Sequence, residues 1–252
     1  MYNAKLGLLT TLLLGLFIII GALIAFLIKR KERVVDFSLG LAFSVIIMLI
    51  ITDMLPEIIE HLGTKHIYLF IIFTVLGFGL LKLLDHFIPD HDDDGKMDTA
   101  QEKKENLVHI GIITSCALVL HNIIEGMAVY SAVISNTSLG IAITLGIGFH
   151  NIPLGMVIAG TFHQSKETLS KTILSIIAVS LSSFVGGLIL FFLNLTAVSS
   201  IVLGILLSLT LGMLLFIAIS ELYPRLHALK NKKTAYIGIT IGFLIQLIAI
   251  FL

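Results

Sequence analysis

Eight long apolar stretches constrain this chain more than any other feature of its sequence. The first runs from Leu6 to Ile28 without a charged residue, and as a helix at ~1.5 Å per residue it would be about 34 Å long, enough to span a bilayer. Because the chain is 57% hydrophobic and only 13% charged, it is far more apolar than a typical soluble domain. The sequence therefore predicts an all-α, polytopic integral membrane protein.

The other apolar stretches cover approximately residues 37–59, 67–88, 107–135, 138–162, 172–195, 198–222 and 234–252. We therefore expect eight transmembrane helices that form one transmembrane domain over residues 1–252, surrounded by the lipid bilayer. The single cysteine, Cys116, lies within one of these spans and has no partner for an intrachain disulfide.

The positions of lysine and arginine predict the orientation of the spans. Most of the sixteen such residues lie in the loops that follow the odd-numbered spans, whereas only Lys5 and Lys65 lie on the opposite side. Cytoplasmic loops carry the excess of basic residues, so we expect both termini outside, in the cell (plasma) membrane. The formal net charge of zero predicts no nucleic-acid partner.

One polar segment, residues 89–106, separates the third span from the fourth. It has no apolar periodicity, so we expect a short flexible cytoplasmic loop. The spacing Asp90-x-Asp92-x-Asp94-Gly95 imitates the start of an EF-hand loop, but the twelfth position is Gln101, where that loop needs a glutamate. A solvated acidic loop is favoured, and weak metal collection by the acids and histidines of residues 85–91 stays open.

A seven-residue phrase occurs twice, as HNIIEGM at 121–127 and as HNIPLGM at 150–156. The two copies lie near the middle of successive spans, which run antiparallel, so their side chains can meet at the membrane midplane. Ionisable groups at this depth cost at least a few kcal/mol each and usually mark a substrate or ion path. The pair therefore indicates a site inside the membrane.

A second pair of phrases suggests internal symmetry. Asp53-x-x-Pro56 lies at the end of span two and Glu221-x-x-Pro224 at the end of span seven, and these two spans cross the membrane in opposite senses. Weak inverted pseudo-repeats of this kind, with sites on interrupted helices, are typical of secondary transporters. The alternative for both acids is that they are solvated near a span end or cap a helix.

The residue types of the repeated phrase favour a transition-metal ion. His121 and Glu125 are four residues apart, so they share a helix face and can reach one ion. His150 comes from the neighbouring span, and Asn122 and Asn151 add amide oxygens. Imidazole with carboxylate suits zinc and its divalent first-row neighbours. A lone histidine in an apolar helix is more often an interhelical contact, but the duplication favours a metal site.

With these residues, the chain resembles the ZIP family of divalent-metal transporters (zinc/iron-regulated-transporter-like) over essentially its whole length. The eight spans, the polar loop after span three and the His-Asn-x-x-acid-Gly phrase of span four carry the resemblance, and the last is the most specific. The residues that match the family's polar positions are His121, Asn122 and Glu125 in span four, His150 and Asn151 in span five, Asp53 in span two and Glu221 in span seven.

The sequence also departs from the family pattern at two positions. The family usually has a histidine or carboxylate after the proline of span five, where this chain has Leu154, and some branches have a glutamate in span six, where this chain has Ser182 and Ser183. The resemblance with these departures implies a reduced site for one ion, built on His121, Glu125 and His150.

The resemblance implies transport of divalent transition-metal ions, most simply zinc uptake toward the cytoplasm, with Zn²⁺ as the substrate and Fe²⁺, Mn²⁺, Co²⁺ or Cd²⁺ as alternatives. An enzyme is not expected. An intramembrane metal-dependent hydrolase is the alternative, although the His-Glu-x-x-His phrase is missing, and a non-transporting metal-binding protein is a third. Gly238-x-x-x-Gly242 is a helix-packing pattern, so a homodimer stays open.

Overall fold

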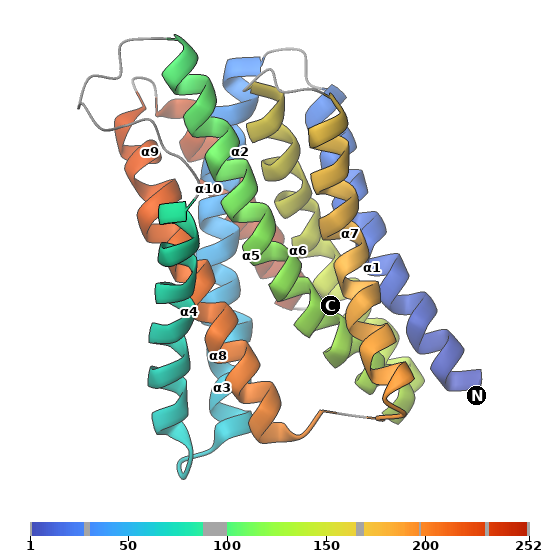
Figure 1. Ribbon diagram of the computed structural model, residues 1–252. Helices are drawn as coiled ribbons and strands as arrows, with labels where there is room; N and C mark the ends of the chain where they lie inside the picture. The colour runs from blue at the N-terminus through green and yellow to red at the C-terminus, as the bar shows by residue number, and fades with distance from the viewer. Residues whose placement is uncertain are drawn as a thin grey trace.

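The computed structural model describes residues 2–27, 31–87, 100–164, 169–196, 198–229 and 232–250, and within these ranges every regular element is a helix (Figure 1). In chain order the elements are α1 (Tyr2–Leu27), α2 (Lys31–Leu49), η1 (Ile50–Met54), α3 (Leu55–Leu62), α4 (Ile67–Phe87), α5 (Ala100–Ser135), α6 (Thr137–Gln164), α7 (Leu169–Phe192), α8 (Ser200–Phe216), η2 (Ile217–Leu222), α9 (Tyr223–Ala228) and α10 (Lys233–Ile250). The expected all-α fold is confirmed.

Seven of the described helices are long and apolar enough to cross a bilayer, with α2–η1–α3 and α8–η2–α9 each forming one continuous span. The eighth predicted span is α10, whose apolar part, Lys233–Ile248, is shorter than the others. Successive spans run in opposite directions (Figure 1). The chain is therefore a multi-pass integral membrane protein, as its hydropathy predicts.

The spans form two groups. In one group α1 packs on α6 and α7, and α5 packs on α6 and α7. In the other group, α2 packs on α10, and α4 packs on α8. In Figure 1, α4 and α8 lie on the left, to one side of the first group. The groups meet where α2 contacts α6 and α5 contacts α8. The two copies of the repeated phrase lie on α5 and α6, so both face this junction from the same group.

Reciprocal glycines bring the main helix pairs close together. At each of these positions, a Cβ atom would overlap a backbone carbonyl of the partner helix. The pairs are Gly21 with Gly155 for α1 and α6, Gly126 with Gly186 for α5 and α7, Gly40 with Gly238 for α2 and α10, and Gly77 with Gly212 for α4 and α8. Small residues allow this approach in membranes, where packing rather than the hydrophobic effect holds helices together.

The glycine pattern of the last span is used within the chain. Gly238 faces the carbonyl of Phe37, and Gly242 faces Ser44 and the carbonyl of Leu41, all on α2. A homodimer that packs through these glycines is therefore excluded by their position in the fold, because α2 already occupies that face.

The predicted loop 89–106 is shorter than expected at its C-terminal end. Residues from Ala100 onward belong to α5, so the last part of that segment is helical rather than a loop. Helix-forming residues such as Gln101, Glu102, Lys103 and Lys104 have high intrinsic helix propensity, and an existing helix propagates readily through them. The EF-hand-like aspartates and His91 lie outside the described residues.

Both acid-x-x-Pro phrases have the same local backbone. A π-helical segment precedes each proline: η1 before Pro56 and η2 before Pro224, and in each copy a backbone N–H bonds the carbonyl five residues earlier. Proline lacks a donor and clashes with the preceding turn, and a π turn is a frequent accommodation at functional sites. The prolines do not end the helices, and the predicted inverted pair is also a structural pair.

Candidate metal centre

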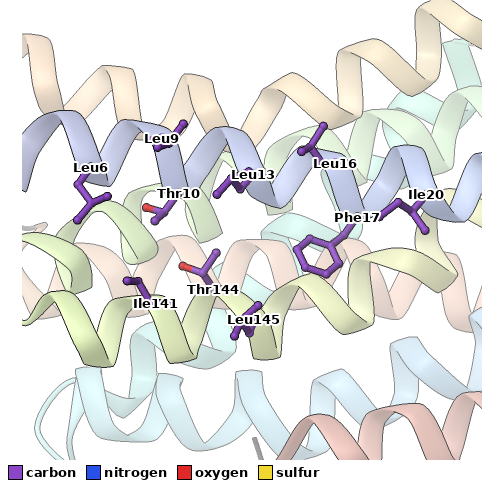
Figure 2. Close-up of a pocket in the computed structure, with 10 residues that line it drawn as sticks. All are labelled: Leu6, Leu9, Thr10, Leu13, Leu16, Phe17, Ile20, Ile141, Thr144 and Leu145. Atoms are coloured by element: carbon purple, nitrogen blue, oxygen red, sulfur yellow. The ribbon is translucent and has the colours of Figure 1, made fainter.

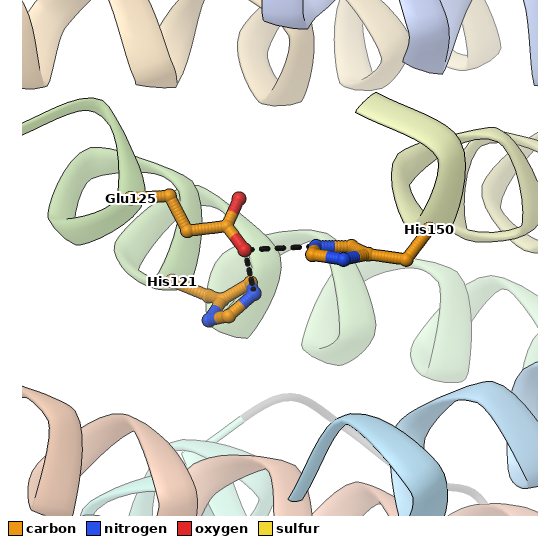
Figure 3. A group of neighbouring side chains, drawn as sticks. All are labelled: His121, Glu125 and His150. Carbon is orange, nitrogen blue, oxygen red and sulfur yellow. Dashed lines mark hydrogen bonds and ion pairs between the residues drawn. The ribbon is translucent and has the colours of Figure 1, made fainter. Parts of the chain in front are cut away.

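Three side chains converge between α5 and α6. Nε2 of His150 forms a hydrogen bond with Oε1 of Glu125 at 2.9 Å, and Nε2 of His121 lies 2.8 Å from the same oxygen (Figure 3). The three residues are buried, with Glu125 the most exposed at 8%. The i, i+4 spacing of His121 and Glu125 places both on one face of α5, and the close packing of α6 brings His150 to them.

The arrangement has the geometry of a metal site. One ligand atom from each residue lies within 4.8 Å of the others. Oε2 of Glu125 and the two ring nitrogens of His121 are buried without a well-oriented hydrogen bond. Buried polar atoms normally find a partner, so these groups are placed for a ligand that they can share. Two imidazoles and one carboxylate are a typical three-residue zinc set, which leaves a fourth position open.

A cavity of about 250 Å³ leads to these residues. Besides the three, Asp53 and Glu57 line it from the second span and Gln246 lines it from α10. Gln246 donates a hydrogen bond from Nε2 to Oδ2 of Asp53 at 2.6 Å. Among the described lining residues are three carboxylates and no lysine or arginine, so the electrostatic potential of the cavity attracts cations.

Among the residues that the structure describes, the cavity lining extends from the histidines in one direction. On α5 its lining runs from His121 to Ala132, and on α6 from Ile143 to His150. These two ranges lie on the same side of the histidines, because the helices are antiparallel. Toward the other side Leu118, Leu154 and Ile158 are almost completely buried in the main hydrophobic core. The three-residue cluster therefore forms the floor of a one-sided vestibule.

The backbone around His150 is interrupted by Pro153, which lies inside α6. A proline at this position removes the hydrogen bond to the carbonyl of Phe149 and disfavours a straight helix. Gly155 follows and contacts the carbonyl of Ile18 on α1. The second copy of the phrase thus combines a ligand, a weakened turn and a tight helix contact within six residues of sequence.

The asparagines of the repeated phrase point elsewhere. Asn122 donates from Nδ2 to the carbonyl of Val179 on α7 at 3.2 Å, and its Oδ1 has no partner. Asn151 is fully buried, and neither its Oδ1 nor its Nδ2 has a hydrogen-bond partner. Neither asparagine lines the cavity. The structure therefore brings together His121, Glu125 and His150 and places the two amides beside them.

The two acids of the inverted pair have different surroundings. Asp53 lines the cavity, whereas Glu221 is buried in η2 and its Oε2 lies 3.5 Å from Nη2 of Arg225. Glu221 is not among the cavity-lining residues. The structure thus places one acid of the pair in the vestibule and the other outside it.

Two cavity residues were missed by the sequence reasoning. Glu57 lies four residues after Asp53, so helical spacing could have identified it on the same face. Gln246 had no local signal, because its proximity to Asp53 arises from the packing of α10 on α2.

A second, larger cavity of about 430 Å³ lies between α1 and α6 (Figure 2). Its lining is apolar except for Thr10 and Thr144, whose hydroxyls bond the carbonyls of Gly7 and Gly140 in their own helices. Because its polar groups are already satisfied and its described lining residues carry no charge, the described part of this groove offers no ligand set for a cation.

Comparison with known proteins agrees with this geometry. The family model for the ZIP zinc transporter matches residues 89–249, well over half of the chain and the part that contains the buried cluster. The chain belongs to the ZIP family. This is a family of transporters and not of enzymes, so the hydrolase alternative is set aside.

The family includes similar curated proteins from several bacteria. Zinc transporter ZupT of Clostridium perfringens is 27% identical over an alignment that covers 100% of this chain and 97% of that protein. Zinc transporter ZupT of Streptococcus mutans is also 27% identical, covering 96% and 95%. Zinc transporter ZupT of Escherichia coli O127:H6 is 27% identical, covering 93% and 92%. The similarity therefore extends over the whole membrane domain.

Proposed function

We propose that this ZIP-family chain transports zinc across the membrane through His121, Glu125 and His150. The observation that carries the proposal is the convergence of these ligands at the floor of an acidic vestibule. A carboxylate and two imidazoles replace part of the hydration shell of the ion, and soft-to-borderline nitrogen ligands favour zinc, iron, cobalt and cadmium over calcium or magnesium. Manganese is a weaker candidate on the same ligands.

The loop charges set the orientation of the vestibule in this proposal. With the basic loops in the cytoplasm, the vestibule opens to the outside, because α5 then runs outward from His121 to Ala132. Both termini lie outside, in the plasma membrane. Ions enter the vestibule from the exterior, pass Glu57 and Asp53, and reach the buried cluster before release into the cytoplasm.

The remaining matched residues have supporting roles in this proposal. Asn122 and Asn151 are buried beside the cluster with unpartnered oxygens, so a side-chain rotation would add an amide ligand to a bound ion. Asp53 guides the ion inward, and Glu221 lies on the cytoplasmic exit. Each acid thereby serves one end of the path.

A single bound ion fits the side chains around the cluster. One helical turn beyond His150 lies Leu154, which is almost completely buried in the hydrophobic core and has no ligand atom. Ser183 on α7 is buried and contributes only a neutral hydroxyl. Fewer charged ligands offset less of the cost of dehydrating a divalent ion, so we expect about one ion per chain.

Uptake into proteoliposomes tests the function. Zinc, iron, manganese, cobalt and cadmium are supplied in turn to the wild-type protein and to the variants His121→Ala, Glu125→Ala and His150→Ala. His66→Ala is the matched control, since His66 lies in the loop between α3 and α4. We expect zinc uptake by the wild type and the control and almost none by the other three. Normal zinc uptake by His121→Ala would contradict the proposed site.

A further inference from the structure

We propose, on the basis of the transport function above, that Arg225 lowers the affinity for zinc on the cytoplasmic side by occupying Glu221. The carrier would then bind zinc tightly from outside and release it readily inside. The buried cluster alone does not make the two ends of the path differ in zinc affinity.

The inverted pair has a charge difference at one equivalent position. In the first copy Glu57 follows Asp53 by four residues, directly after Pro56. In the second copy Arg225 follows Glu221 by four residues, directly after Pro224. Because a π-helical segment precedes the proline in both copies, positions 57 and 225 correspond in backbone as well as in sequence.

The two copies use this position differently. Asp53 and Glu57 both line the vestibule, and Glu57 is exposed in it. Nη2 of Arg225 instead contacts Oε2 of Glu221 at 3.5 Å, with the Glu221 side chain 10% exposed and that of Arg225 24% exposed. One end thus presents two carboxylates to an approaching cation, whereas the other presents a carboxylate that a guanidinium already holds.

The second copy of the acid-x-x-Pro phrase lies between the metal cluster and the cytoplasmic end of the path. Segment η2 packs against α5, the helix of His121 and Glu125, and also against α2. The cavity ends at the histidines, and the closed half of the protein lies between them and the cytoplasmic loops. When that half opens, Glu221 is the buried acid nearest the end of span seven, and Arg225 is the cation beside it.

Zinc and the guanidinium of Arg225 compete for one carboxylate, that of Glu221. Zinc that arrives from the cytoplasm must displace the guanidinium or bind without Glu221, and both are unfavourable because the like charge of Arg225 is close. Zinc that has left the cluster is not retained by Glu221, because Arg225 already holds that carboxylate, and so it dissociates into the cytoplasm faster. Detailed balance keeps Vmax/KM equal in the two directions for a passive carrier without a membrane potential. The asymmetry must therefore appear as a higher KM together with a higher Vmax on the cytoplasmic side.

Right-side-out and everted membrane vesicles measure the two sides separately. For Arg225→Gln we expect the cytoplasmic-side KM for zinc to fall roughly tenfold, as Coulomb estimates for a nearby screened charge suggest. The external KM should stay within about twofold. Zinc inside right-side-out vesicles should also begin to inhibit uptake. A merely structural role would change both sides together.

Two further variants keep the test decisive. Arg225→Lys retains the positive charge and should retain the asymmetry. The double variant Glu221→Gln with Arg225→Gln removes both charges, avoids an unpaired buried carboxylate, and should lose the gain in cytoplasmic affinity. An unchanged cytoplasmic-side KM in Arg225→Gln overturns the inference, and so does a gain that persists in the double variant.

A binding measurement separates this inference from the transport function. In detergent, Arg225→Glu removes the guanidinium from Glu221 and places a second carboxylate beside it, so calorimetric titration should detect tighter zinc binding than in the wild type. Wild-type protein that carries no zinc in vesicles would contradict the proposed function, whatever the titration shows. Wild-type transport with an unchanged zinc affinity in Arg225→Glu would contradict only the role of Arg225.

Discussion

Replacing Glu125 by glutamine separates the metal role of this residue from its structural role. The amide has nearly the same shape as the carboxylate and keeps an oxygen for the contacts of 2.8 and 2.9 Å with the two histidines. It removes the negative charge and replaces the other carboxylate oxygen by an NH₂ group. Glu125→Gln is therefore a sharper test than truncation to alanine, which also leaves a cavity.

The expected loss of stability is small. The metal-free protein loses the extra strength of charge-assisted contacts to one buried oxygen, which amounts to about 1–2 kcal/mol. The expected loss of zinc affinity is larger. Changing a residue that only supports a metal ligand costs about 10–100-fold, so losing a charged ligand from a set of three should cost at least ~100-fold, or ~2.7 kcal/mol at ~1.4 kcal/mol per tenfold.

Calorimetric titration in detergent measures the affinity. Thermal unfolding followed by circular dichroism measures the stability, because the chain is helical and contains no tryptophan to serve as a fluorescence probe. Glu60→Gln is the matched control, since Glu60 is an exposed residue of α3 outside the cavity lining. Zinc affinity within threefold of the wild type in Glu125→Gln would refute the proposal that Glu125 is a ligand.

Asp53→Asn should raise the external KM for zinc several-fold and leave the maximal rate nearly unchanged, since it weakens only the acidic approach; a fall in rate alone would contradict this. Gly126→Ala should destabilise the protein by about 1–3 kcal/mol through overlap with α7, whereas Gly79→Ala, which meets no neighbour, should be neutral in thermal unfolding. Leu154→Glu should increase the affinity or number of zinc ions in titration, and an unchanged isotherm counts against it. Lys65→Cys in a Cys116-free background should label from outside, and labelling only after permeabilisation would reverse the topology.

The span pattern and the central pair were predictable because they depend on local sequence. An uncharged run such as 6–28 must be a helix in a bilayer, since its backbone groups have no other partners. His121 and Glu125 share a face because four residues make about one turn. The acid-x-x-Pro pair was also visible, although its π-helical backbone was not, because the choice between an α and a π turn depends on packing around each proline.

The tertiary structure alone decided which polar groups meet. From the repeated phrases alone, Asn122 and Asn151 are as good candidates for metal ligands as the histidines. In the structure, however, the rotation of each helix points Asn122 toward α7 and leaves Asn151 outside the cavity. The same packing brings Gln246 to Asp53 across nearly the whole chain and separates Asp53 from Glu221. Spacing along a helix is fixed by covalent geometry, whereas the rotation and partners of each helix depend on contacts such as the reciprocal glycines, which no single segment encodes by itself.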